Sequence, residues 1–205
     1  MRYFPLMIDT HGKKVLIVGG GKAATLKIKG LMNSSFVFYC LSPAFDDDLL
    51  ALKKKCPDRL FLKQMSVTCD FRFFAYDFLI AATDNDALNA ALLHRAKLAS
   101  VPALSVSNSE ESDFHTAPIL TRGPLAVSIS TNNPTVTKHI KDDLDEFLSR
   151  YDPKKLVEMN RIRALLVERK SEHIAAIMDD LWQEEKITKE HWEDRNDTTG
   201  GNARK

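Results

Sequence analysis

The chain has 205 residues, 44% of them hydrophobic, which is enough for one globular domain with a smaller appendage and a substantial core. Its 29 basic and 28 acidic side chains leave a net charge of +1, so there is no general attraction to nucleic acid or to an anionic membrane. The apolar runs are too short to span a bilayer, no export signal is recognised, and three widely spaced cysteines exclude a disulfide framework and argue against a cysteine zinc site. We therefore expect a cytoplasmic protein without nucleic-acid or membrane partners.

The first half of the chain alternates short apolar runs with helical hydrophobic repeats. Strands are expected at residues 14–18, 36–41, 59–62, 76–82 and 101–106. Helices are expected at 22–32, 46–55 and 86–98, with Leu49, Leu50 and Leu52 of the second helix facing inward. Strands that are apolar along their whole length are buried on both faces. The pattern therefore predicts an α/β fold with a Rossmann-like, doubly wound parallel sheet.

The pattern changes near residue 113. Two extended segments, 117–120 and 125–130, flank a turn-forming stretch and predict either a hairpin or an extension of the sheet. A helix is expected at 135–151, with Ile140, Leu144, Phe147 and Leu148 on one side. Asp152-Pro153 breaks it, and two charged amphipathic helices are expected at 155–172 and 173–183.

A glycine-rich turn separates the first strand from the first helix. Gly19-Gly20-Gly21 with Ala24 fits the dinucleotide-binding pattern Gly-x-Gly-x-x-Gly/Ala. Gly19 permits the tight turn, Gly21 lets a pyrophosphate approach the backbone, and the helix N-terminus attracts the phosphates. A turn without a ligand is the alternative, but the strand–turn–helix context favours dinucleotide binding.

Polar residues also follow the ends of the other predicted strands. Two compatible roles are expected after the fourth strand: Thr83 and Asp84 face the cofactor, and Asp84 or Asn85 caps the next helix. Segment 107–115 holds three carboxylates and a histidine, and is either an acid–base site or a solvated loop. The second strand ends in Ser42-Pro43, without an acid for a ribose 2′-hydroxyl or an arginine for a 2′-phosphate. This position therefore leaves the choice between NAD and NADP open.

Several segments together resemble the precorrin-2 dehydrogenase family, the dehydrogenase domain of siroheme synthase, some members of which are also ferrochelatases. They are Tyr3–Leu6, Val15–Ala24, Lys27, Ser42-Pro43, Ile80–Asp84, Asp113-Phe114, Pro118 and Arg122–Thr131. The similarity covers about residues 2–150. It implies NAD-dependent oxidation of precorrin-2 to sirohydrochlorin, a step in siroheme biosynthesis.

The resemblance also implies a homodimer and a domain order. We expect an NAD-binding Rossmann domain at 1–113, a small α+β dimerisation region at 114–150 and a helical domain at 151–195. A polar tail at 196–205 is expected to be disordered.

Binding residues follow from the motifs and from the resemblance, which itself supplies Lys22, Ala23, Pro43 and Ala44. The expected cofactor-binding set is Gly19, Gly20, Gly21, Lys22, Ala23, Ser42, Pro43, Ala44, Thr83 and Asp84. A polycarboxylate substrate, precorrin-2 or sirohydrochlorin, would be held by charge-assisted hydrogen bonds. The candidates for this role are Arg122, Ser130, Thr131, Lys138 and His139, with Lys141 beside them. No metal ligands are expected.

One departure from the family concerns catalysis. Members usually carry an aspartate at the position of Ser107, and a hydroxyl cannot replace that carboxylate as a base without an activating neighbour. We expect Asp113 or His115 to take over the proton at the site marked by Ser107. Dehydrogenation should survive this change better than metal insertion, because the cofactor supplies the difficult chemistry. Two alternatives stay open: a tetrapyrrole- or nucleotide-binding protein with impaired catalysis, and a chelatase that needs no nucleotide.

Overall fold

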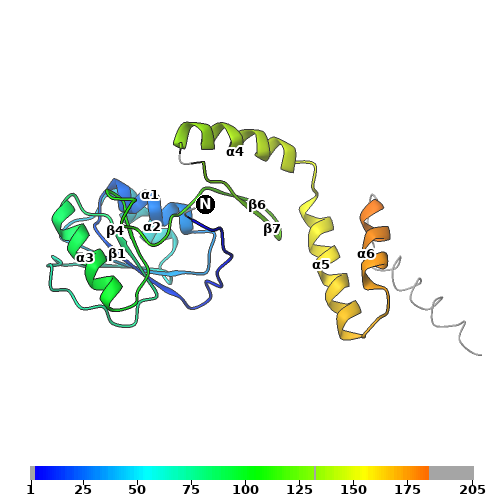
Figure 1. Ribbon diagram of the computed structural model, residues 1–205, viewed down its shortest axis with the longest axis horizontal. Coiled ribbons are helices and arrows are strands. Elements are labelled where there is room, and N and C mark those ends of the chain that lie inside the picture. The colour runs from blue at the N-terminus through cyan, green and yellow to red at the C-terminus, as the bar shows by residue number, and fades with distance from the viewer. Residues whose placement is uncertain (1–2, 132, 185–205) are drawn as a thin grey trace, which may run out of the picture. The chain divides into compact units, whose positions relative to one another are not determined.

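The structure is a computed structural model that describes residues 3–131 and 133–184. The chain divides after Ala117 into two compact units (Figure 1). The first unit contains a five-stranded parallel sheet in the order β3-β2-β1-β4-β5. Its strands are β1 (Lys14–Val18), β2 (Val37–Ser42), β3 (Leu60–Gln64), β4 (Phe78–Ala81) and β5 (Ala103–Ser105).

Helices cover both faces of this sheet. They are α1 (Lys22–Leu31), α2 (Asp47–Lys55) and α3 (Asp86–Leu98). Alternate residues of β1 point to opposite faces, so Ile17 packs in one core cluster with Ile28 of α1 and Leu49 of α2. Leu16 packs in the other cluster with Leu92 of α3. The predicted Rossmann-like, doubly wound fold is therefore confirmed, because every residue of β1 after Lys14 is buried from both sides.

Two helices of this unit, α2 and α3, begin at short polar side chains. Asp46 caps α2 by accepting a hydrogen bond from the Asp48 amide at 2.9 Å, and Asn85 caps α3 by accepting one from Leu88 at 3.0 Å. Asn85, not Asp84, is therefore the cap of the helix predicted at 86–98. Leu50 is 41% exposed, so its expected inward orientation is wrong, because it lies about 100° around the helix from the buried Leu49.

The second unit begins with an antiparallel hairpin of β6 (Ile119–Arg122) and β7 (Leu125–Ser128). Three helices follow it in the part of this unit that the structure describes: α4 (Pro134–Leu148), α5 (Pro153–Glu168) and α6 (Ile174–Gln183). Asp152-Pro153 does separate two helices, but Pro153 is the first residue of α5, with Asp152 as its cap. The helix expected at 155–172 is α5, and it ends at Glu168 instead of Glu172 because the backbone turns left-handed at Lys170 (φ 54°).

Two separate hydrophobic clusters stabilise this unit. One joins the hairpin to Leu144 and Leu148 of α4, and the other joins α5 to α6 around Ile162 and Leu166. Of the four apolar residues expected on one side of α4, Ile140 and Phe147 are exposed. The observed division after Ala117 lies four residues beyond the expected boundary at 113, and a further division at residue 151 stays a prediction. The expected disordered tail lies outside the described residues.

Within the described part of the chain, no helix is long and apolar enough to cross a membrane.

Candidate functional site

The turn between β1 and α1 is shaped by two glycines that could not carry a side chain. Gly19 has φ 118°, and a Cβ added there would lie 2.2 Å from the carbonyl oxygen of Ala82, which follows β4. A Cβ on Gly20 would lie 2.2 Å from the carbonyl oxygen of Ala44, which follows β2. The glycine turn therefore packs directly against the chain leaving both neighbouring strands.

Gly21 is different, because a Cβ added to it would meet nothing within 4 Å. It is the N-cap residue of α1, and neither a side-chain cap nor an acidic residue occupies the first turn of this helix. Lys22 and Ala23 are exposed beside it, so the first amides of α1 are available to an anion. Open space over a glycine and an uncapped helix N-terminus fit the diphosphate of a dinucleotide.

Cys40 of β2 supports the turn from within the core. Its thiol donates a hydrogen bond to the Gly19 carbonyl oxygen at 3.1 Å. Burial raises the pKa of this thiol to about 12, so it stays neutral and unreactive near pH 7. Cys40 thus has a structural role, supporting the glycine turn from β2.

The chain after β2 forms the neighbouring wall of the site. Ser42 is buried against Gly20, whereas Pro43 and Ala44 are exposed beside the glycine turn. The only acid in this stretch, Asp46, is occupied: its side chain caps α2 and its amide donates to the Gly20 carbonyl oxygen at 2.8 Å. Pro43 and Ala44 therefore lie where a dinucleotide in the turn would contact the protein.

At the carboxyl edge of the sheet, where the glycine turn also lies, a residue that the sequence analysis did not single out joins the ends of β4 and β5. Asn89 of α3 is 1% exposed, and its amide makes hydrogen bonds to Thr83 and to Ser107. The Thr83 hydroxyl is therefore occupied by Asn89, while Asp84 is exposed at the same edge. A signal was present in the sequence, because Asn89 is a polar residue in the inward helical stripe of Leu92, Leu93 and Ala96.

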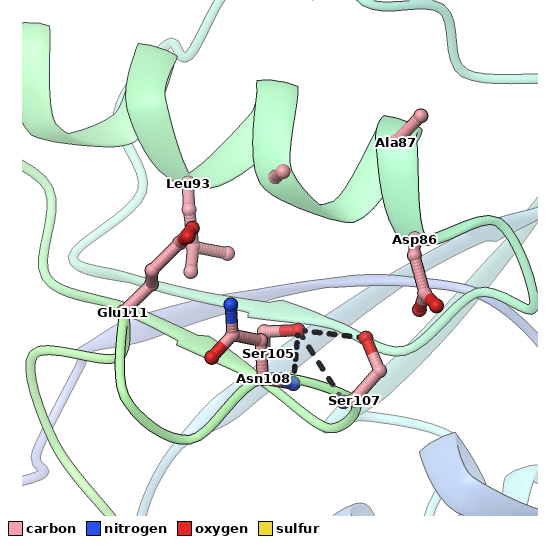
Figure 2. A pocket seen from close by; sticks show the side chains of 8 residues that line it. Asp86, Ala87, Leu93, Ser105, Ser107, Asn108 and Glu111 are labelled. Carbon is pink, nitrogen blue, oxygen red and sulfur yellow. Dashed lines mark hydrogen bonds between the residues drawn. The ribbon is translucent and has the colours of Figure 1, made fainter.

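A cleft of about 420 Å³ opens between α3 and the end of β5 (Figure 2). Its floor is apolar where Ala87, Ala90 and Leu93 of α3 line it. Figure 2 shows Asp86 at one end and Glu111 near Leu93 at the other, with the Ser105, Ser107 and Asn108 side chains between the helix and the loop. Ser107 is the one expected catalytic residue that the structure places here.

Asp113 does not lie at this edge of the sheet, so its expected place beside Ser107 is wrong. The Asp113 carboxylate accepts a hydrogen bond from the amide of Ala103, the first residue of β5, at 3.0 Å. Phe114 contacts Phe78, the first residue of β4. After Ser107 the chain runs back along β5 to Asp113 at the amino edge of the sheet. His115 packs on Tyr3, whose hydroxyl donates to the carbonyl oxygens of Ser109 and Ser112 in the loop after Ser107. The position of Asp113 removes the reason for assigning the proton to it, and the role expected of His115 stays a prediction.

The expected substrate-binding residues all belong to the second unit, and the structure separates them into two groups. Ser130 and Thr131 precede α4, and Thr131 bonds to Thr137 of that helix at 2.6 Å. The exposed Lys138 and His139 are on the next turn, with Lys141 following. Arg122 is apart from them, because its guanidinium pairs with Asp145, near the other end of α4, at 2.5 Å.

No cluster of three or more metal-ligating side chains occurs in the described part of the chain.

Comparison with known proteins connects this geometry to a family. Residues 6–117 match a family described as "Putative NAD(P)-binding". The siroheme synthase of Gluconacetobacter diazotrophicus is 27% identical over 98% of this chain and 41% of its own length. The precorrin-2 dehydrogenase of Priestia megaterium is 28% identical over 73% of this chain and 71% of its own.

A solved structure of "SirC, precorrin-2 dehydrogenase" superposes on this chain with a TM-score of 0.64 and 26% sequence identity, covering 87% of this chain and 90% of that one. With respect to the siroheme synthase of Gluconacetobacter diazotrophicus, this chain spans less than half of that protein's length. The family match extends from residue 6 to 117, over more than half of the chain, and includes the whole parallel sheet and its glycine turn. This chain therefore belongs to that NAD(P)-binding family.

Proposed function

We propose that this protein oxidises precorrin-2 to sirohydrochlorin with NAD as the hydride acceptor, in siroheme biosynthesis. The observation that carries the proposal is the glycine turn, whose two packed glycines hold Gly21 and the uncapped start of α1 open to a diphosphate. It is supported by the similarity to precorrin-2 dehydrogenases in sequence and in structure. The substrate loses two hydrogens, one as a hydride to the cofactor and one as a proton.

In this mechanism the protein mainly binds and orients. The amides near Lys22 and Ala23 would hold the diphosphate, and Pro43 and Ala44 would contact the adenosine half. NAD supplies the hydride acceptor when it is bound. Correct placement of reacting groups is worth about 7–11 kcal/mol, more than one acid–base group contributes. The proton leaves to water or to a carboxylate of the cleft that Ser107 lines. The carboxylates in this cleft are Asp86 and Glu111.

NAD is proposed over NADP on the resemblance to the precorrin-2 dehydrogenase family, because the end of β2 offers neither a free acid nor a cation that would decide between the two cofactors. Residues 42–46 contain no lysine or arginine, and their one acid caps a helix. The ribose would then be bound by backbone and hydroxyl groups.

In the second unit, Lys138, His139, Ser130 and Thr131 are proposed to bind carboxylates of the tetrapyrrole. Arg122 would do so only by exchanging its partner Asp145 for a substrate carboxylate.

A homodimer is also proposed, through the β6–β7 hairpin and α4. Val136, Ile140 and Phe147 of α4 form an apolar stripe that the unit leaves exposed, and Ile119 of β6 is 46% exposed. We further propose a cytoplasmic location, because all three cysteines are free.

An anaerobic assay tests the function. The full chain is mixed with precorrin-2 and NAD, and NADH absorbance is followed; turnover supports the proposal. The second candidate, a binding protein that no longer turns over, is favoured by Ser107, which puts a hydroxyl where a base is needed. Binding of both ligands without NADH formation would establish that candidate and overturn the first.

A parallel reaction with sirohydrochlorin and Fe²⁺ or Co²⁺ tests the third reading. Metal insertion without nucleotide, together with no NADH formation in the first assay, would identify a chelatase.

A further inference from the structure

We infer that Ser107 acts as a hydrogen-bond donor to an acceptor oxygen of a bound ligand, and that Asn89 and Ser105 orient its hydroxyl for this role. The inference rests on the proposed function, since it concerns the same site. It follows from counting donors and acceptors around three side chains at the carboxyl ends of β4 and β5.

The orientation of the Asn89 amide is determined by one residue. Its Oδ1 accepts from the Thr83 amide at 3.2 Å and from the Thr83 hydroxyl at 2.7 Å. Its Nδ2 donates to the Thr83 carbonyl oxygen at 3.0 Å. A flipped amide would place N–H against N–H and C=O against C=O, so the observed orientation is the only one that satisfies Thr83.

The second Nδ2 proton of Asn89 points to Ser107 Oγ at 3.3 Å. The amide nitrogen can only donate, so Ser107 Oγ accepts this hydrogen bond. Asn89 is almost fully buried, and its two donors and its carbonyl oxygen are then all satisfied.

Ser105 supplies a second donor to the same oxygen. Its Oγ accepts from the amides of Ser107 at 3.3 Å and of Asn108 at 3.2 Å, and neither nitrogen can act as an acceptor. The single hydroxyl proton of Ser105 must therefore be donated. Among the described residues, the acceptor within reach is Ser107 Oγ at 3.2 Å (Figure 2). Ser105 is 5% exposed, so water offers it little alternative.

Ser107 Oγ thus accepts two hydrogen bonds, which fills both of its lone pairs. Its own proton has no acceptor within these three residues and is free to point into the cleft, where Ser107 is exposed. A hydroxyl in this state cannot take a proton from a substrate. It can donate to a carbonyl or carboxylate oxygen. The nicotinamide carboxamide offers a carbonyl oxygen, and a tetrapyrrole side chain offers carboxylate oxygens.

Calorimetric affinities of the full chain show whether the acceptor is the nicotinamide carboxamide or a tetrapyrrole carboxylate. NAD, ADP-ribose and sirohydrochlorin are titrated into the wild-type protein and into Ser107→Ala, Ser107→Thr and the matched loop control Ser109→Ala. If the carboxamide is the acceptor, Ser107→Ala weakens NAD binding by about 2- to 12-fold and leaves ADP-ribose unchanged. If a carboxylate is the acceptor, sirohydrochlorin binding falls by roughly 10-fold or more. Ser107→Thr keeps the hydroxyl and the affinity in either case.

Asn89 is tested as a positioning residue through Asn89→Asp, which can accept but not donate. The Ser107 proton is then drawn toward the new carboxylate, so Asn89→Asp should lose the same affinity as Ser107→Ala. The double variant should lose no more than either single one. A purely structural role would instead lower the melting temperature and give additive losses.

The outcomes are distinct. If Ser107→Ala binds all three ligands as the wild type does, the inference is overturned while the proposed function stands. If the wild type binds neither NAD nor sirohydrochlorin, the proposed function fails first. Ser107 is an exposed loop residue, so its variants remain informative even if Asn89→Asp does not fold.

Discussion

At the scale of single residues, the glycines of the turn after β1 are constrained in different ways. Gly19 is held by the protein itself, through its positive φ and the Ala82 carbonyl oxygen at 2.2 Å from a hypothetical Cβ. Gly21 has an ordinary φ of −87° and empty space beside it. Gly19 is therefore required by the fold, and the space beside Gly21 is available to a ligand.

This difference predicts opposite results for two alanine substitutions. Gly19→Ala should lower the free energy of unfolding by roughly 1–3 kcal/mol from backbone strain alone, measured by urea denaturation. Gly21→Ala should melt within a few degrees of the wild type but bind NAD about tenfold more weakly or worse in calorimetry, a loss of about 1.4 kcal/mol. Unchanged NAD affinity in Gly21→Ala would mean that no diphosphate lies over this residue.

Cys40 predicts a pH dependence of stability. Its folded pKa of about 12 lies above the ordinary value of 9.0, so the folded state holds the proton more tightly. The resulting stabilisation is complete below pH 9 and is lost as the pH rises from 9 to 12, by up to about 1.4 kcal/mol per pH unit. Urea denaturation at pH 8 and 10 should show a smaller decrease in Cys40→Ala than in the wild type.

The proteins are compared by how much the free energy of unfolding changes between pH 8 and pH 10, which is the slope. Absolute stabilities are not compared, because Cys40→Ala also leaves a cavity. Cys69→Ala, at an exposed cysteine, is the control and should keep the wild-type slope. Equal slopes for all three proteins would contradict the assignment to Cys40.

At the scale of elements, α3 shows what a pattern can and cannot predict. Its bounds, Asp86–Leu98, agree with the sequence prediction, because an N-cap and a regular apolar repeat are local signals. The roles of Asn89 and Asp86 were missed. They depend on where the loop after β5 lies relative to the helix, which no spacing along the chain specifies.

The helix α4 carries more apolar surface than its own unit covers. Leu144 and Leu148 pack on the hairpin, while Ile140 and Phe147 are 37% and 43% exposed on the adjoining face. An apolar stripe wider than the covered face is a feature of helices that pack against a second partner.

We expect Ile140→Glu with Phe147→Glu to convert a dimer into a monomer in light scattering after gel filtration. Each unpaired carboxylate buried at the interface costs several kcal/mol, so the dissociation constant should rise at least 100-fold. Asp142→Ala, on another face of the same helix, should remain dimeric. A double glutamate variant that stays dimeric would place the interface elsewhere.

At the scale of the whole molecule, the two units divide the proposed tasks. Both core clusters of the parallel sheet and every proposed cofactor residue lie before residue 118. The proposed substrate cations and the apolar stripe of α4 lie after it. Dinucleotide binding should therefore be separable from turnover.

Residues 1–117 expressed alone should fold cooperatively and bind NAD with an affinity within a few-fold of the full chain. The same fragment should be monomeric and should form no NADH from precorrin-2. Circular dichroism, calorimetry and the anaerobic assay check these outcomes. A fragment that turns over the substrate would show that the second unit is dispensable.

The sequence by itself determined the order of strands and helices, the doubly wound sheet and the glycine turn, because these depend on hydrophobic period and on residues adjacent in the chain. Only the tertiary structure decided which polar residues meet. Asp113, six residues after Ser107, lies at the opposite edge of the sheet because the chain turns back along β5. Asn89, eighteen residues before Ser107, lies within hydrogen-bond distance of it because α3 packs across the ends of β4 and β5. Proximity in a parallel sheet follows the strand edge and not the distance along the chain.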